Sequence, residues 1–357
     1  MSFWQSIFGS ASALGVDIGT TSIKMVEVAE SSSIYRLKNY GLLESYGHLE
    51  RLNNAIQTSS LKLFEKETVA LIQMLLKQVN PSTKNVVASI PPFSSFVTLL
   101  EMPMMSDNET AHGMPYQARQ YIPLPVSEVA IDWLKVGEKE DENGIKKQQV
   151  LLISVPNEQI NKYRAIFKAA GLNLVSLEIE GLALTRMLIN GDQTPTLILD
   201  IGARSTNLLV TDQGHLKLVA QTDFAGGTLT QAVASGLNVN VKRAEELKKL
   251  RGLSGREGEY ELSTLMFPYL DAIIGEAKRL KIRYETEYAG KVERVIIAGG
   301  SANLPGILPY VEKELSLPTI KADPFSLIKY PGNLEPIISE LGPMFSVALG
   351  LAIRGLI

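Results

Sequence analysis

The sequence contains no cysteine, which removes whole classes of chemistry at once. A disulfide scaffold, a thiolate nucleophile, an iron–sulfur cluster and a Cys-ligated zinc site are all excluded. Histidine is nearly as scarce: the three present, His48, His112 and His215, are far apart and none belongs to an HExxH pattern. We therefore do not expect zinc catalysis.

The chain also lacks an excess of positive charge and a long apolar run. Thirty-five Lys and Arg stand against 38 Asp and Glu, giving a net charge of −3, so a nucleic-acid partner is not expected. The most apolar uncharged stretches are interrupted by Gly, Pro, Ser and Asn, and no basic region opens the chain. The sequence therefore predicts neither a membrane-spanning helix nor a signal peptide, and we expect a cytoplasmic protein. GxxxxGK[ST] and GxGxxG are absent too, so P-loop and Rossmann nucleotide sites are not supported.

What is present is an ordinary globular composition of 357 residues, 45% apolar and 20% charged. This length predicts two or three domains, and the polar joint 191–195 is a candidate boundary. Residues 1–8 place Phe3, Trp4, Ile7 and Phe8 on one helical face. Such an amphipathic segment either packs on its own protein or attaches the protein to a partner or a membrane through its apolar face.

Periodicity and turn residues predict alternating strands and helices. Residues 93–170 are expected to form a compact β-α-β-β-α unit, with a hairpin turn at Asn143-Gly144 and a last helix that ends at Gly171. The expected strands are 85–90, 96–101, 129–135, 148–155 and 174–179, and the expected helices are 61–79, 107–121, 157–170 and 180–190.

Two strand–turn–strand segments repeat each other. Residues 14–28 read LGVDIGTTSIKMVEV and residues 197–211 read LILDIGARSTNLLVT. Each opens one half of the chain, so the repeat predicts two related domains facing each other. A glycine after Asp-Ile permits a tight turn, and the successive amides of such a turn form a nest for phosphate oxygens.

The side chains of the repeat fit the same ligand. Thr20, Thr21, Ser22, Ser205 and Thr206 supply hydroxyl groups, and Lys24 supplies a positive charge. Asp17 and Asp200 end equivalent strands and would hold Mg²⁺ through its waters beside a polyphosphate.

A third glycine segment follows the strand expected at 292–298. Gly299 and Gly300 precede Ser301 and Asn303, and consecutive glycines allow the backbone to approach a flat ligand such as adenine.

Two Asp-Ile-Gly hairpins and a late Gly-Gly-Ser-x-Asn loop resemble the actin-like ATPase superfamily. The segments SIPPFSSFVTLLEMP, ARQYIPLPVSEVAIDW, EIEGLALTRML and DFAGGTLTQAVA, with 150–171, resemble its PilM family of type IV pilus assembly proteins, which is similar to the division protein FtsA. This implies an α/β, actin-like (ribonuclease H-like) two-domain ATPase fold with an FtsA-type inserted α/β subdomain. The implied parts are an N-terminal segment at 1–13, a first domain at 14–92 and 172–193, an insertion at 93–171, a second domain at 194–343 with an adenosine-closing subdomain near 228–290, and a C-terminal helix at 344–357 returning to the first domain.

The resemblance implies ATP and Mg²⁺ as ligands. Glu180 stands where superfamily members orient the attacking water, although it could equally cap its helix, and Arg204 is a bulky departure within the second loop. The implied ligand residues are Asp17, Gly19, Thr20, Thr21, Ser22 and Lys24 in the first loop; Asp200, Gly202, Ala203, Ser205 and Thr206 in the second; Gly226 and Gly227 at a helix start; Glu245, Glu246 and Lys249 on the adenosine-closing helix, where they could also be a solvated face; and Gly299, Gly300, Ser301 and Asn303 around adenosine. Hydrolysis is expected to be slow or absent.

The resemblance further implies a docking role at the inner membrane. The cytoplasmic N-terminal tail of PilN would dock in a groove between the first domain and the insertion, with 121–125 and 96–101 as candidate walls. A PilO-containing complex and the pilus ATPase or platform are further implied partners, in the machinery of twitching motility, and membrane contact would be indirect. Two alternatives stay open: a sugar or small-molecule kinase of the same superfamily, and a polymerising FtsA-like cytoskeletal ATPase. The oligomeric state is left open.

Overall fold

A computed structural model describes residues 12–44, 61–140, 144–253, 260–288 and 290–357. The amphipathic face at 1–8 and Asn143 of the expected turn lie outside these ranges. Gly144, within them, has a φ of 76°. None of the helices described is long and apolar enough to cross a membrane.

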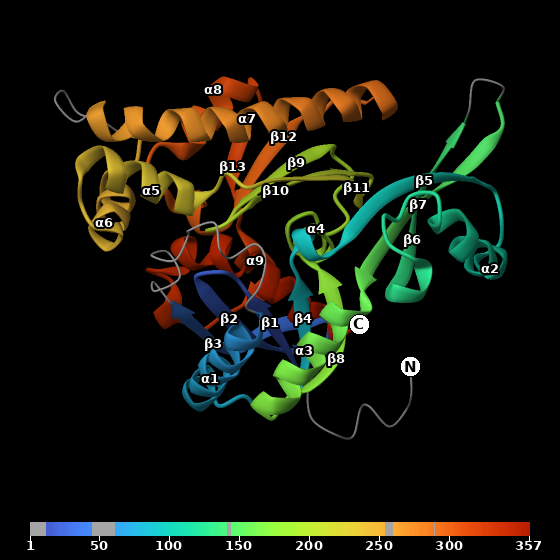
Figure 1. The fold of residues 1–357 in the computed structure, drawn as a ribbon, viewed down its shortest axis with the longest axis horizontal. Coiled ribbons are helices and arrows are strands. Elements are labelled where there is room, and N and C mark those ends of the chain that lie inside the picture. Colours follow the sequence, from blue (N-terminus) through green and yellow to red (C-terminus); the bar gives the residue numbers. More distant parts are fainter. Residues whose placement is uncertain (1–11, 45–60, 141–143, 254–259, 289) are drawn as a thin grey trace.

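The first domain is built on a six-stranded sheet in the order β14-β3-β2-β1-β4-β8 (Figure 1). Buried runs of β-branched and aliphatic residues account for its central strands. The strands are β1 (Ser12–Ile18), β2 (Ser22–Ser31), β3 (Ile34–Glu44), β4 (Asn85–Ile90), β8 (Asn173–Ile179) and β14 (Ile328–Lys329).

The second domain repeats the arrangement with a five-stranded sheet in the order β11-β10-β9-β12-β13. In each sheet an antiparallel hairpin, β1–β2 or β9–β10, is followed in space by a parallel neighbour of its first strand. The strands are β9 (Thr196–Ile201), β10 (Thr206–Asp212), β11 (His215–Thr222), β12 (Arg294–Ala298) and β13 (Thr319–Lys321).

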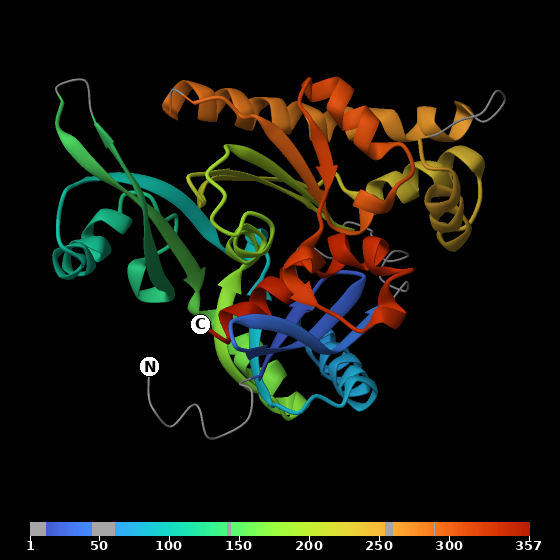
Figure 2. The same cartoon turned by 180° about the vertical axis from the view of Figure 1, so that it is seen from behind.

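Helices cover both sheets. The outer face of the second sheet packs on helices of its own domain, while α4 and α9 lie between the two sheets (Figures 1 and 2). The helices are α1 (Leu61–Val79), α2 (Asp107–Ala118), α3 (Asn157–Ala170), α4 (Glu180–Leu188), α5 (Gly226–Leu237), α6 (Val241–Arg251), α7 (Tyr260–Tyr288), α8 (Ile307–Leu315) and α9 (Ile338–Arg354).

Glycines set the close packing at the centre of the molecule. A Cβ on Gly15 would lie 2.0 Å from the Ala348 carbonyl oxygen, and one on Gly350 would lie 2.2 Å from the Ala183 oxygen. Helix α9 therefore presses its backbone onto β1 on one side and onto α4 on the other. This contact seats the C-terminal helix against the first domain.

The insertion projects to one side as a three-stranded sheet in the order β5-β7-β6 (Figure 1). Its strands are β5 (Phe96–Pro103), β6 (Val129–Glu140) and β7 (Lys146–Pro156). Helix α2 covers this sheet and opens with a capping box between Ser106 and Glu109. It ends three residues before the expected Tyr121.

Helix α3 spans the expected 157–170 and ends at Gly171, whose φ of 83° closes the helix as anticipated. It does not complete the insertion, however. Its buried residues Tyr163, Ile166 and Phe167 share a core with α1 and β1. The segment expected to be one two-layer unit is therefore divided: β5 to β7 form the projecting sheet, and α3 covers the first domain.

The insertion is tied to the second domain by a buried lysine. Lys217 on β11 is 2% exposed, and its Nζ donates to the Val136 carbonyl oxygen at 2.5 Å and to Gln149 Oε1 at 3.1 Å. A bulge in β6 and a Gly137 φ of 156° make room, since a Cβ there would lie 2.6 Å from Nζ. The insertion thus contacts both domains.

Candidate functional site

The two hairpins form matching turns at the junction of the domains. The Gly19 amide donates to the Ser22 carbonyl oxygen at 2.9 Å, and the Gly202 amide donates to the Ser205 oxygen at 3.1 Å. In the part of the chain described, the amides inside these turns, Thr20 and Thr21 in the first, make no hydrogen bond of their own. The same holds for Ala203, Arg204 and Ser205 in the second.

Such amides are suited to an anion. Successive unpaired N–H groups in a tight turn form a concave, electropositive nest. The half-buried Thr20, Thr21 and Ser22 surround the first turn. The two turns are therefore suited to hold the phosphate groups of the ligand that we expect from the sequence.

Carboxylates gather between the turns. Asp17 Oδ2 accepts from Lys24 Nζ at 3.0 Å, and Asp17 Oδ1 accepts from Ser89 Oγ at 2.9 Å. Asn207 Nδ2 donates to Glu180 Oε2 at 2.7 Å and to Asp200 Oδ2 at 3.3 Å. Asn207 and Ser89 were missed by the sequence analysis. Asn207 could have been found by aligning the repeat, since it stands opposite Lys24.

Burial and the charges of neighbouring groups shift the pKa values of several side chains in this cluster. Burial, together with the Asp17 charge, raises the pKa of Asp200 to about 6. Burial and the neighbouring Asp17 and Asp200 raise the pKa of Glu180 well above its ordinary value. Burial alone would lower the pKa of Lys24, but the surrounding carboxylates outweigh it and raise that pKa.

This cluster has the chemistry for a hydrated cation rather than a closed metal cage. Carboxylate oxygens are the donors that Mg²⁺ prefers, and Mg²⁺ usually keeps several waters. Among the described residues, no three His, Asp or Glu side chains are grouped so as to hold a metal ion directly. Asp17 and Asp200 therefore fit a water-mediated Mg²⁺ site.

The third glycine segment lies against the second hairpin. A Cβ on Gly299, whose φ is 80°, would lie 2.5 Å from the Ile201 carbonyl oxygen and 2.8 Å from Asp200 Oδ1. Gly300 has open space around it. A Cβ on Gly226 would lie 2.7 Å from Ser301 Oγ, so Ser301 faces Gly226 at the start of α5. The fold therefore brings residues 299–301, the second hairpin and the start of α5 together, as the sequence predicts.

Several expected ligand residues are already engaged within the protein. The amides of Gly226 and Gly227, at the start of α5, donate to the carbonyl oxygens of Gly202 and Ala203 at 2.9 and 2.7 Å. These glycines lock α5 to the second hairpin, so their amides are not open phosphate donors.

Two more side chains are likewise occupied. Thr206 Oγ1 donates to the Phe224 carbonyl oxygen at 2.7 Å, and Asn303 Nδ2 donates to the Glu340 oxygen at 2.8 Å. Direct contact of these two groups with a nucleotide would require them to leave those partners.

Lys248 lies on α6 between the expected ligand residues Glu245 and Lys249, and the sequence analysis did not identify it. Lys248 is 6% exposed and reaches Glu245 at 2.7 Å, the Gly226 oxygen at 2.9 Å and Thr230 Oγ1 at 2.8 Å. Burial lowers the pKa of Lys248, and Lys248 in turn outweighs burial to lower the pKa of Glu245. Glu246 is exposed and pairs with Arg243.

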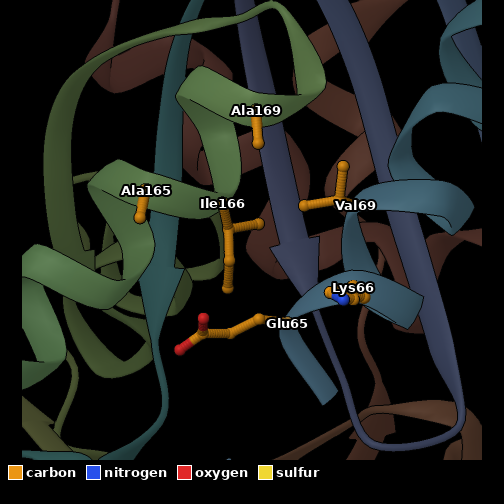
Figure 3. A pocket seen from close by; sticks show the side chains of 6 residues that line it. All are labelled: Glu65, Lys66, Val69, Ala165, Ile166 and Ala169. Atoms are coloured by element: carbon orange, nitrogen blue, oxygen red, sulfur yellow. The ribbon is translucent and has the colours of Figure 1, made fainter. Parts of the chain in front are cut away.

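Two cavities lie away from this cluster. One of about 300 Å³ lies between α1 and α3, with Val69 and Ile166 in its walls and Glu65 and Lys66 beside them (Figure 3). The other, of about 510 Å³, lies by the end of α4 and β13. No residue predicted to bind nucleotide lines either cavity.

Comparison with known proteins settles the family. The family model described as "Type IV pilus assembly protein PilM" matches residues 15–356. This chain belongs to the PilM family. A solved structure entitled "PilM-PilN type IV pilus biogenesis complex" has a TM-score of 0.82 at 23% identity, and the match covers 98% of this chain and 100% of that one.

More distant matches agree on the fold. Cell division protein FtsA of Enterococcus hirae is 22% identical over 91% of this chain and 84% of its own. MreB5 of Spiroplasma citri bound to ADP has a TM-score of 0.57 at 14% identity, covering 96% and 95% of the two chains. The expected two-domain actin-like fold is therefore confirmed, and the chain is an actin-like type IV pilus assembly protein of the PilM family.

Proposed function

We propose that this protein binds Mg-ATP between its two hairpins and uses the bound nucleotide to brace the two domains. The observation that carries the proposal is the meeting of three glycine segments at one carboxylate cluster, with unpaired amides in both turns. The solved MreB5 structures, bound to ADP and to AMPPNP, support it as examples of the same fold with a nucleotide.

In this proposal each group has a limited task. The turn amides and Lys24 hold the phosphates, Asp17 and Asp200 hold the waters of Mg²⁺, and Gly299 to Ser301 border adenosine. Magnesium supplies charge neutralisation when bound. The carboxyl of Glu180 is already engaged, since its Oε2 accepts a hydrogen bond from Asn207 Nδ2 at 2.7 Å. We propose slow or absent hydrolysis, because that oxygen would have to leave Asn207 in order to orient an attacking water.

We propose further that the insertion and the first domain hold the cytoplasmic N-terminal tail of a PilN-type partner, which places the protein at the inner membrane indirectly. The complex entitled PilM-PilN supports this. Tyr121 and Leu124 of the expected wall are 46% and 42% exposed, and Tyr116 is 70% exposed, while Ile122 between them is core. Exposed aromatic and aliphatic side chains are typical anchors for a peptide.

A calorimetric titration with a synthetic PilN tail peptide, with and without Mg-ATP, tests the docking. Specific micromolar binding that is weakened by Tyr116→Ser or Leu124→Ser supports it. Ile145→Ser, at a 60% exposed residue directly before β7 and outside the expected wall, is the matched control. Absence of binding in both nucleotide states would refute the docking role.

A further inference from the structure

Arg204 stands in the second hairpin where the first has Thr21. It is the single arginine in either repeated segment, 14–28 or 197–211. Its own amide is one of those unpaired in the turn. The side chain therefore starts from the backbone of the phosphate nest.

The guanidinium of Arg204 lies over the Phe93 ring, 4.9 Å from its centroid. Phe93 follows β4, whose Ser89 donates to Asp17. The stack thus joins the turn of the second domain to the segment that follows β4 in the first.

The Phe93 ring holds the Arg204 guanidinium only weakly. Phe93 is 54% exposed, and a cation–π contact in water gains little. A phosphate oxygen offers the planar guanidinium charge-assisted hydrogen bonds, which are much stronger. A phosphate group in the neighbouring turn would therefore draw the guanidinium away from the ring.

The charge balance of the site favours the same exchange. Lys24 pairs with Asp17 at 3.0 Å, and the charges of Asp200 and Glu180 also act on this lysine. A triphosphate adds more negative charge than a diphosphate, so the longer nucleotide gains more from a second cation.

We propose that Arg204 recognises the terminal phosphate of ATP, with Phe93 as its resting place, and so makes the site prefer ATP to ADP. This rests on the proposed nucleotide function. It assigns the discrimination to one side chain that lies outside the general pattern of the two loops.

The test is a pair of titrations, ATP and ADP at fixed Mg²⁺, on four proteins: wild type, Arg204→Ala, Phe93→Leu and Arg283→Ala. Arg283, an exposed residue of α7 that pairs with Glu287, controls for loss of an arginine charge. We expect wild type and Arg283→Ala to prefer ATP about tenfold or more, and Arg204→Ala to lose that preference while keeping ADP affinity within about twofold.

Phe93→Leu separates recognition from a merely structural stack. If Arg204 only steadied the loop through Phe93, both substitutions would act alike. Recognition of phosphate predicts instead that Phe93→Leu keeps the ATP preference.

Three results would overturn the inference. A wild type that binds ADP and ATP equally, or an Arg204→Ala variant that keeps the preference, leaves the proposed nucleotide function standing and removes this role for Arg204. A wild type that binds neither nucleotide removes both. Thermal unfolding without nucleotide verifies that each variant is folded.

Discussion

Lys24 and Asn207 occupy equivalent positions in the two hairpins. Lys24 lies across the antiparallel ladder from Asp17, and Asn207 lies across the ladder from Asp200. One copy of the repeat therefore neutralises its aspartate with a buried cation, while the other offers only a neutral amide, which it shares with Glu180. The duplicated backbone is chemically asymmetric, and the second hairpin carries Asp200, whose ionisation is opposed by burial and by the Asp17 charge.

Removing the cation tests this asymmetry. Lys24→Met should lower the free energy of unfolding by about 3 kcal/mol, because it leaves the Asp17 carboxylate buried without its partner. The double variant Asp17→Asn/Lys24→Met should recover much of that loss. Urea unfolding of the four proteins of this cycle measures the coupling; additive losses would show that the pair is not coupled.

Asp200 should make stability depend on pH in the direction opposite to an ordinary ion-paired carboxylate. Its folded pKa of about 6 lies above the ordinary value of 3.8, so ionisation weakens the fold: the penalty is complete above pH 6 and disappears as the pH falls from 6 toward 3.8. Asp200→Asn should be more stable than wild type by about 1–3 kcal/mol at pH 8, and the difference should shrink by pH 5. Denaturant unfolding with EDTA present measures this. A difference that grows on acidification would contradict the assignment.

Gly299 and Gly300 form a matched pair of neighbours. Gly299→Ala should destabilise the protein by about 2–4 kcal/mol, because the residue has a φ of 80° and its Cβ would strike the Ile201 carbonyl oxygen. Gly300→Ala, with open space around its Cβ, should cost less than about 1 kcal/mol. Thermal unfolding compares them, and equal losses would show that the close approach is unimportant.

Lys217 should hold the insertion in place. Lys217→Ala leaves the Val136 oxygen and Gln149 without their donor and should cost about 1–3 kcal/mol, with faster amide exchange in β6 and β7. Lys278→Ala, at an exposed ion pair on α7, is the control. Unchanged exchange in β6 and β7 would mean that the apolar contacts alone secure the insertion.

The two turns of the candidate site could be predicted from the sequence because their signals are local. Asp-Ile-Gly followed by a strand encodes each hairpin within a few residues, and the repeat implied that the two face each other. The boundaries of α3 were equally readable, since Gly171 ends it. The partner of α3 was not readable, because the residues that bury Tyr163 and Phe167 belong to distant α1 and β1.

The side chains missed share that long-range character. Nothing in the neighbouring sequence distinguishes Lys248 and Lys217, and only the fold reveals that each is buried against carbonyl oxygens of another segment. Strand β3 was passed over because its exposed and buried positions do not alternate cleanly. Conversely, the hydroxyl of Thr206 looked like a ligand, but the structure uses it to fasten β10 to the Phe224 carbonyl.

The most direct test of the central claim is a calorimetric titration of Mg-ATP into wild type, Gly300→Trp and Gly332→Trp. Both glycines are exposed with open space at Cβ, so both variants should fold, but only Gly300 borders the proposed adenosine position. We predict that wild type and Gly332→Trp bind one Mg-ATP with equal affinity, and that Gly300→Trp loses binding at least tenfold. Equal binding by all three proteins would contradict the placement of the nucleotide, and no binding by wild type would contradict the nucleotide function itself.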